Sequence, residues 1–165
     1  MDLPADSDVH SEWSWDAPGG DMIKTCILAE EFGLPAVAFT EHLDHTTWQV
    51  ARDGLEADHL LVRLSDRDGV LVPPIFDVAG YLNAAEECRA RFLQLRILTA
   101  VELGEPHRHP VQVAQVLRDG HFDRVLGSVH TLADRGGYTE PPGMFTHLDP
   151  ACQGELRPAV QSKST

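Results

Sequence analysis

Histidines and carboxylates gather in four short clusters of this chain, and these residue types are the common ligands of zinc, manganese and iron. The clusters are Asp6-Ser7-Asp8-Val9-His10, Thr40-Glu41-His42, Val101-Glu102 and Ser128-Val129-His130. Donors of this kind, brought together, hold one or two divalent metals that acidify a bound water and clamp phosphate oxygens. The clusters therefore predict a metal site suited to hydrolysis of a phosphate ester.

The elements that must position these clusters are parallel strands. Apolar runs over residues 36–40, 95–101 and 124–129 lead directly into three of the clusters and are typical of buried strands. A shorter, weaker strand over residues 4–10 carries the first cluster. The carboxyl ends of parallel strands converge on one rim of the sheet, so we expect the four clusters to meet there.

Within the predicted site, strand geometry selects the side chains that face the metal. Asp8 and His10 are two residues apart and share one face of a strand, together with Asp6. Asp16 lies on the following loop, from which it can bend back to the rim. Of Glu41 and His42, we expect that one reaches the site and the other turns away. The expected metal ligands are Asp8, His10, Asp16, His42, Glu102 and His130.

Three helices are predicted between the strands. The first covers residues 22–32, with Asp21 as its N-cap and Gly33 as its end. The others cover residues 76–92 and residues 110–117, the last beginning at a proline. Residues 45–75 form a long connection, and the chain after His130 reads as a loop. The alternation of strands and helices predicts the α/β class with a parallel sheet.

Length, charge and composition limit the classes of protein to which this chain can belong. The 165 residues suffice for one domain, and a formal net charge of −13 argues against non-specific nucleic-acid binding. No apolar run approaches the length of a membrane span, and the N-terminus lacks the apolar core of a signal peptide. The three cysteines show no metal-binding or redox spacing, which is typical of a reducing compartment. We therefore expect a cytoplasmic protein.

Each donor also has a structural interpretation when it is taken alone. A single histidine at a strand end is more often a capped surface or core residue, and Glu102 and Asp16 are ordinary as boundary and turn acids. Recurrence at four successive strands favours the metal site. His107 and His109 also have the spacing of ligands, but they lie in a loop beyond Glu102, where we expect exposed side chains.

The quoted motifs resemble those of the polymerase and histidinol phosphatase (PHP) superfamily. The resemblance rests on Ser-Asp-Val-His-Ser-Glu-Trp-Ser-Trp-Asp (7–16), Phe-Thr-Glu-His-Leu-Asp (39–44), Val-Glu-Leu-Gly (101–104) and Leu-Gly-Ser-Val-His (126–130). It implies a distorted seven-stranded TIM-like barrel, up to three metals, and hydrolysis of histidinol phosphate in histidine biosynthesis. The family's metal-ligand positions correspond here to His10, Asp16, His42, Glu102 and His130.

The sequence departs from the family pattern at two points, and both change the metal site and the barrel that we expect. Asp8 stands where the family has the first His of His-x-His, and a hard carboxylate there favours manganese or magnesium. No Asp-x-His follows His130, where His147 and Asp149 are the only ready donors. We therefore expect a partial (β/α) barrel over residues 1–150, the first half of a truncated PHP domain. Residues 151–165 would be a disordered tail, and fewer metals than three would bind.

The donor clusters predict a metal-dependent phosphate-ester hydrolase with zinc, manganese or iron as cofactor, and the resemblance implies a phosphomonoester hydrolase of the histidinol-phosphatase type. The expected nucleophile is a metal-bound hydroxide, and Arg135 would orient the phosphate of a small substrate. One alternative is a non-catalytic metal-binding PHP fragment, and another is a PHP phosphoesterase that acts on nucleotides. An open half-barrel would also expose its fourth strand as an edge, which favours self-association.

Overall fold

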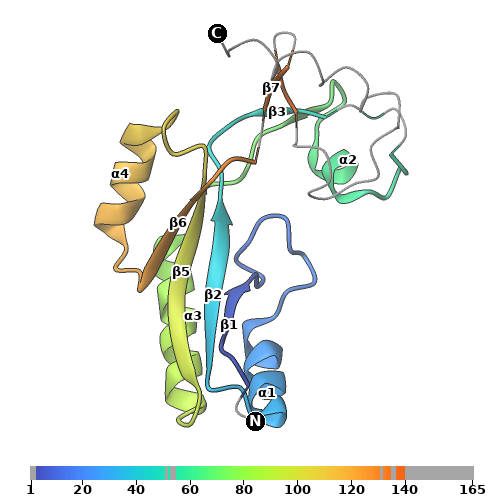
Figure 1. Ribbon diagram of the computed structural model, residues 1–165. Helices are drawn as coiled ribbons and strands as arrows, with labels where there is room; N and C mark the ends of the chain where they lie inside the picture. Colours follow the sequence, from blue (N-terminus) through green and yellow to red (C-terminus); the bar gives the residue numbers. More distant parts are fainter. Residues whose placement is uncertain (1–2, 51, 53–54, 131, 135–136, 140–165) are drawn as a thin grey trace, which may run out of the picture. The chain divides into compact units, whose positions relative to one another are not determined.

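The computed structural model describes residues 3–50, 52, 55–130, 132–134 and 137–139 (Figure 1). These residues divide into two compact units. One comprises the chain up to Thr47 together with Val72–Val129, and the other comprises Trp48–Leu71 with the chain from His130 onward.

The first unit is built on a parallel sheet of four strands, in the order β1-β2-β5-β6. The strands are β1 (Asp6–Val9), β2 (Ala36–Leu43), β5 (Arg96–Gly104) and β6 (Arg124–Ser128). Helices α1 (Met22–Phe32), α3 (Val78–Arg91) and α4 (Pro110–Asp119) connect them. This alternation of parallel strands and helices confirms the predicted α/β class.

Helix α1 begins and ends where the sequence predicts. The side chain of Asp21 accepts a hydrogen bond from the backbone N of Lys24, which satisfies a free amide of the first turn. Gly33 ends the helix with φ of 71°, a left-handed conformation that glycine adopts without a steric cost. The observed bounds Met22–Phe32 match the predicted helix.

The core lies between β2, β5 and the helices α1 and α3. Met22, Cys26 and Ala29 of α1 pack there with residues of α3 and with alternate residues of the two strands. The strand residues in this core cluster include Val37, Phe39 and Ile97. Because side chains alternate along a strand, His42 falls on the face opposite to Val37 and Phe39.

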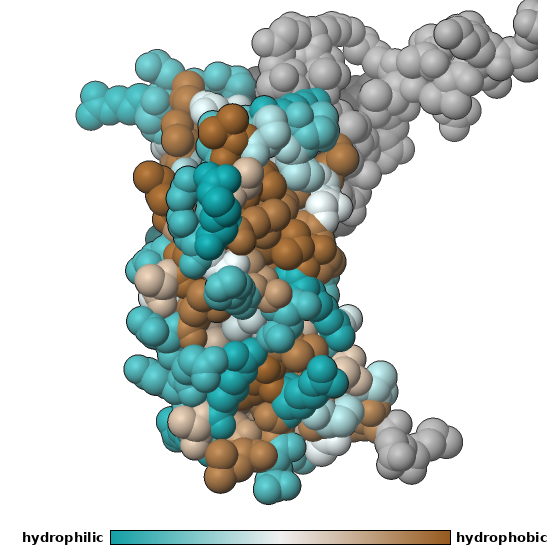
Figure 2. Space-filling model, turned by 90° about the vertical axis from the view of Figure 1, so that its left-hand side faces the viewer, coloured by the Kyte–Doolittle hydropathy of each residue, from teal (hydrophilic) through white to brown (hydrophobic). Residues whose placement is uncertain are grey.

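Strand β6 lies at the edge of the sheet, where much of its apolar surface is exposed. Val125 and Leu126 retain 47% and 37% of their accessible surface. β5 is the only strand of the described chain that pairs with β6. Figure 2 looks onto the side on which α4 and β6 lie in Figure 1, and apolar side chains gather there. The exposed strand edge expected from the sequence is therefore present in the part of the chain that is described.

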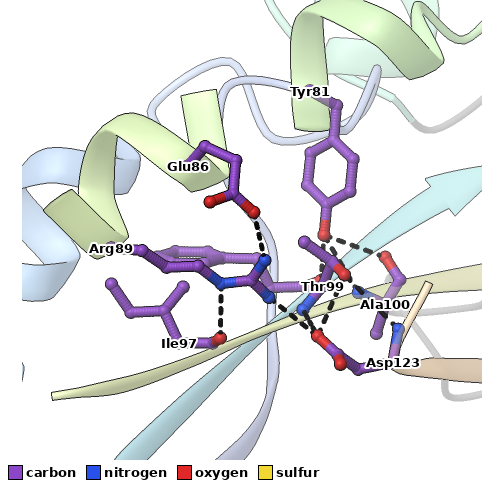
Figure 3. Close-up of polar contacts among 8 residues, drawn as sticks. Tyr81, Glu86, Arg89, Ile97, Thr99, Ala100 and Asp123 are labelled. Carbon is purple, nitrogen blue, oxygen red and sulfur yellow. Dashed lines mark hydrogen bonds and ion pairs between the residues drawn. The ribbon is translucent and has the colours of Figure 1, made fainter. Parts of the chain in front are cut away.

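A polar network fastens α3 to the sheet (Figure 3). Arg89 donates to the carbonyl O of Ile97 at 3.0 Å and to Asp123 Oδ2 at 2.8 Å. The same carboxylate accepts from the backbone N of Thr99. The hydroxyl of Tyr81 donates to the carbonyl O of Phe39 at 2.7 Å and accepts from the backbone N of Ala100 at 2.9 Å. Tyr81 therefore bridges β2 and β5 near the middle of the two strands.

The second unit contains short elements within the long connection expected over residues 45–75. Strands β3 (Trp48–Gln49) and β4 (Val70–Leu71) pair antiparallel, and helix α2 (Leu60–Leu64) lies between them in sequence. Strands β7 (Leu132–Asp134) and β8 (Gly137–Thr139) form a second antiparallel pair. The expectation of a loop after His130 is therefore wrong for these residues, since three-residue strands are too short to show a periodicity.

The observed strands also run further than predicted. β2 continues to Leu43 and β5 to Gly104, so Glu41, His42 and Glu102 lie inside strands rather than after them. The polar residues resembled strand ends, but pairing between β2 and β5 continues through them. Residues 140–165, which include the predicted tail, lie outside the described residues. None of the described helices combines the length and apolar character needed to cross a membrane.

Candidate metal centre

Three of the predicted ligands converge at the carboxyl ends of the strands. His10 follows β1, His42 lies near the end of β2 and Glu102 near the end of β5. One donor atom from each side chain lies within 4.8 Å of those of the other two. Nε2 of His42 is 3.1 Å from Oε2 of Glu102. The parallel register produces this contact, because His42 and Glu102 are paired directly across the two strands.

The orientation of His10 leaves one ring nitrogen for a ligand. Its Nδ1 lies 2.6 Å from the carbonyl O of Thr40. A carbonyl oxygen only accepts hydrogen bonds, so this contact places the proton on Nδ1 and leaves the lone pair on Nε2. The His10 ring stands edge-on to the His42 ring, with centroids 4.2 Å apart. Support of one imidazole nitrogen by an outer group is typical of histidines that bind metals.

Asp16 bends back to the site, as the sequence analysis allowed. Its Oδ2 lies 2.6 Å from Nδ1 of His42. Its Oδ1 is buried and has no hydrogen-bond partner among the residues that the structure describes. A buried carboxylate oxygen without a partner is costly in an apolar setting, and a cation would relieve that cost. Asp16 thus supports His42 from the side opposite to Glu102.

The two carboxylates control the charge of His42. Burial by itself lowers the pKa of this imidazole, but the hydrogen bonds and charges of Asp16 and Glu102 outweigh burial and raise the pKa to about 9. The protein without metal therefore holds a proton on His42 at neutral pH. A position that attracts a proton between two carboxylates also attracts a divalent cation. Two imidazoles and a carboxylate form a donor set that fits zinc, manganese or iron.

Glu41 turns away from the three donors and is completely buried, with 0% of its surface exposed. Burial raises the pKa of its carboxyl, although hydrogen bonds from Ser11 and Ser14 oppose that shift. Strand geometry predicts that one of Glu41 and His42 turns away from the site, and in the structure this residue is Glu41.

The other predicted ligands have different outcomes. Asp8 is exposed on β1 and is not one of the three converging donors. His130 belongs to the second unit, whereas the three converging donors belong to the first. Its role as a ligand stays a prediction. Arg135, His147 and Asp149 lie outside the described residues.

A second polar group, which the sequence analysis missed, lies beyond the ends of β2 and β5. Thr46 Oγ1 lies 2.8 Å from Nε2 of His109 and donates to Oε2 of the buried Glu105 at 3.2 Å. Burial, with a smaller contribution from His109, lowers the pKa of His45. His107 is exposed as expected, whereas His109 is partly buried and hydrogen-bonded, contrary to expectation. Only the spacing Glu105-Pro106-His107-Arg108-His109 signals this group in the sequence.

The fold and the site together define a class of protein, the (β/α) barrels that carry metal donors at the carboxyl ends of their strands. The profile of the PHP domain matches residues 6–157 of the 165 residues. The chain belongs to the PHP family. No curated protein matches it in sequence.

A solved structure supports the assignment of the fold. The chain is similar to a histidinol phosphate phosphatase from Lactococcus lactis subsp. lactis, solved in complex with zinc, L-histidinol and phosphate. The sequences are 21% identical, the TM-score is 0.57, and the match covers 79% of this chain. The chain spans 41% of the length of that protein. The expected partial barrel is thereby confirmed.

Proposed function

We propose that this chain is a metal-dependent phosphoesterase domain. The observation that carries the proposal is the convergence of His10, His42 and Glu102 within 4.8 Å at the carboxyl ends of parallel strands, in a chain of the PHP family. A divalent metal held there supplies a Lewis acid, which lowers the pKa of water and polarises phosphate oxygens.

Each residue of the site has a proposed part. His10 offers Nε2, His42 offers Nε2 and Glu102 offers a carboxylate oxygen. Asp16 orients the His42 ring through Nδ1, from which its Oδ2 lies 2.6 Å away. We retain Asp8 and His130 as proposed additional ligands, and Arg135 as the proposed contact to phosphate.

The proposed substrate is a small phosphomonoester, with histidinol phosphate as the first compound to test. The similar structure from Lactococcus lactis contains L-histidinol and phosphate, which supports this choice. A second candidate is a metal-binding domain without turnover of its own, because the chain spans 41% of the similar phosphatase.

Metal-dependent hydrolysis by the full chain tests the proposal. The protein is stripped with a chelator, reloaded with zinc, manganese or iron, and assayed with histidinol phosphate, p-nitrophenyl phosphate and a nucleotide phosphodiester. Turnover of the monoesters that returns with the metal and is lost in Glu102→Gln supports the proposal. His107→Ala, at an exposed histidine, is the matched control and should retain activity.

The other outcomes distinguish the alternatives. Stoichiometric metal without turnover of any substrate would favour the non-catalytic domain. Cleavage of the nucleotide diester in preference to the monoesters would favour a nucleotide phosphoesterase. Activity that survives complete removal of metal would contradict the proposed function.

A further inference from the structure

We propose that Glu41 is a positioning residue, whose buried carboxylate holds the loop between β1 and α1 against β2 and thereby sets the contact between Asp16 and His42. This inference rests on the proposed function, because it assigns a purpose to a residue beside the metal centre. Figure 1 shows the loop beside the upper part of β2.

The hydrogen bonds to the carboxylate of Glu41 all come from residues of that loop. Its Oε1 accepts from the hydroxyl of Ser11 at 2.5 Å. Its Oε2 accepts from the backbone N of Ser11 at 3.0 Å and from the hydroxyl of Ser14 at 2.6 Å. Three hydrogen bonds to one buried carboxylate fix its position against the loop, and they offset part of the cost of burying it.

Ser14 carries the link from Glu41 to the neighbouring histidine. While its hydroxyl donates to Glu41, the same oxygen accepts from the backbone N of His42 at 2.9 Å. One hydroxyl therefore connects the loop both to the side chain of Glu41 and to the main chain of His42. Asp16 follows Ser14 by two residues, so its carboxylate reaches Nδ1 of His42 from a fixed point.

Other side chains of the loop have partners that do not involve Glu41. The role of Glu41 can therefore be distinguished from the folding of the loop as a whole. Trp15 Nε1 donates to Asp44 Oδ2 at 2.9 Å, and Glu12 Oε2 accepts from the backbone N of Met22 at 2.7 Å. These contacts hold the loop against the end of β2 and the start of α1. The segment that leads to Asp16 is held to β2 by Glu41 and by Ser14, and the indole of Trp15 adds its own contact to Asp44.

The test uses two readouts on Glu41→Gln and Ser14→Ala. The first readout requires no metal. In the metal-free protein, the Nδ1 proton of His42 should give a downfield resonance, because it is held between Nδ1 and Asp16 Oδ2, which are 2.6 Å apart. That resonance, assigned by its loss in His42→Gln, should shift or broaden in both variants as it does in Asp16→Asn.

The second readout is the affinity for cobalt or zinc, measured by competition with a chelator. Each variant should bind metal about 10–100-fold more weakly, the usual cost of removing a group that orients a ligand. The double variant with Asp16→Asn should lose no more than Asp16→Asn alone, because Glu41 acts through Asp16. Cobalt absorption spectra should show an altered ligand field in the single variants.

Glu12→Gln is the matched control, since Glu12 lies in the same loop but serves α1. It should lower the unfolding temperature without moving the His42 resonance or the metal affinity. If Glu41→Gln and Ser14→Ala lower only the unfolding temperature, the inference is overturned and Glu41 is purely structural. If the wild type binds no metal, the proposed function fails, and the resonance alone decides the role of Glu41.

Discussion

His42 and Glu102 face each other across two neighbouring parallel strands, with Nε2 of the histidine 3.1 Å from Oε2 of the glutamate. Their side chains meet because the strands pair in register up to Leu43 and Leu103. Asp16 approaches the other nitrogen of the same ring at 2.6 Å. An imidazole between two carboxylates makes His42 the centre of the candidate site.

Metal content should depend on both members of this pair. We expect His42→Ala and Glu102→Ala each to reduce bound zinc or manganese, measured by elemental analysis after dialysis, to the level of the chelator-treated protein. The reason is that each substitution removes one of three converging donors. His107→Ala should keep the wild-type content. Unchanged content in both site variants would mean that these residues are structural.

The stability of the metal-free protein should fall as pH rises toward the alkaline range. The pKa of His42 is raised to about 9 in the folded protein, from 6.5 for an ordinary histidine. Protonation of His42 therefore stabilises the fold fully below about pH 6.5, and that contribution disappears as pH rises through about 9. Urea unfolding in the presence of chelator should show this decline in the wild type.

His42→Gln supplies the comparison for that experiment. Its free energy of unfolding should lack the part of the pH dependence between pH 6.5 and 9 that His42 causes. The difference between the two proteins should shrink with rising pH. A difference that grows with pH would show that His42 is neutral in the folded protein.

Tyr81 should be important for the stability of the sheet. Tyr81→Phe keeps the ring but removes the hydroxyl that joins the carbonyl of Phe39 to the amide of Ala100. Because both partners are buried, we expect a loss of about 1–3 kcal/mol in the free energy of unfolding. Urea unfolding measures this, with an unchanged slope as the check that the folded state persists. A change below the error of the measurement would show that the strands pair without the hydroxyl.

Self-association through β6 remains a prediction that the exposed edge motivates. Val125 and Leu126 retain 47% and 37% of their surface on an edge strand, and such edges recruit further strands. We expect concentration-dependent oligomers in sedimentation velocity, and Val125→Lys should shift them toward the monomer. Val111→Lys, at a residue of α4 that is 75% exposed, should leave the distribution unchanged. A wild type that stays monomeric at high concentration would contradict the prediction.

The sequence alone was sufficient for the features that depend on neighbouring residues. The helix Met22–Phe32 follows from a capping aspartate, an apolar stripe and a terminal glycine, all within about a dozen positions. The parallel α/β class follows from the alternation of apolar runs with amphipathic segments. The donor types of His10, His42 and Glu102 were also readable, because each directly follows or ends an apolar run.

Only the tertiary structure decided which side chains meet. Asp16 reaches His42 across 26 positions of the chain, and Glu41 turns to the loop although it is adjacent to His42. The hydrogen bond from Thr46 to Glu105 spans 59 positions and has no local signal. Local hydrogen bonding and periodicity determine the elements, whereas strand register and loop packing determine distances between residues far apart in sequence. The sequence therefore determined the chemistry available to this protein, and the pairing of β2 with β5 decided where that chemistry is assembled.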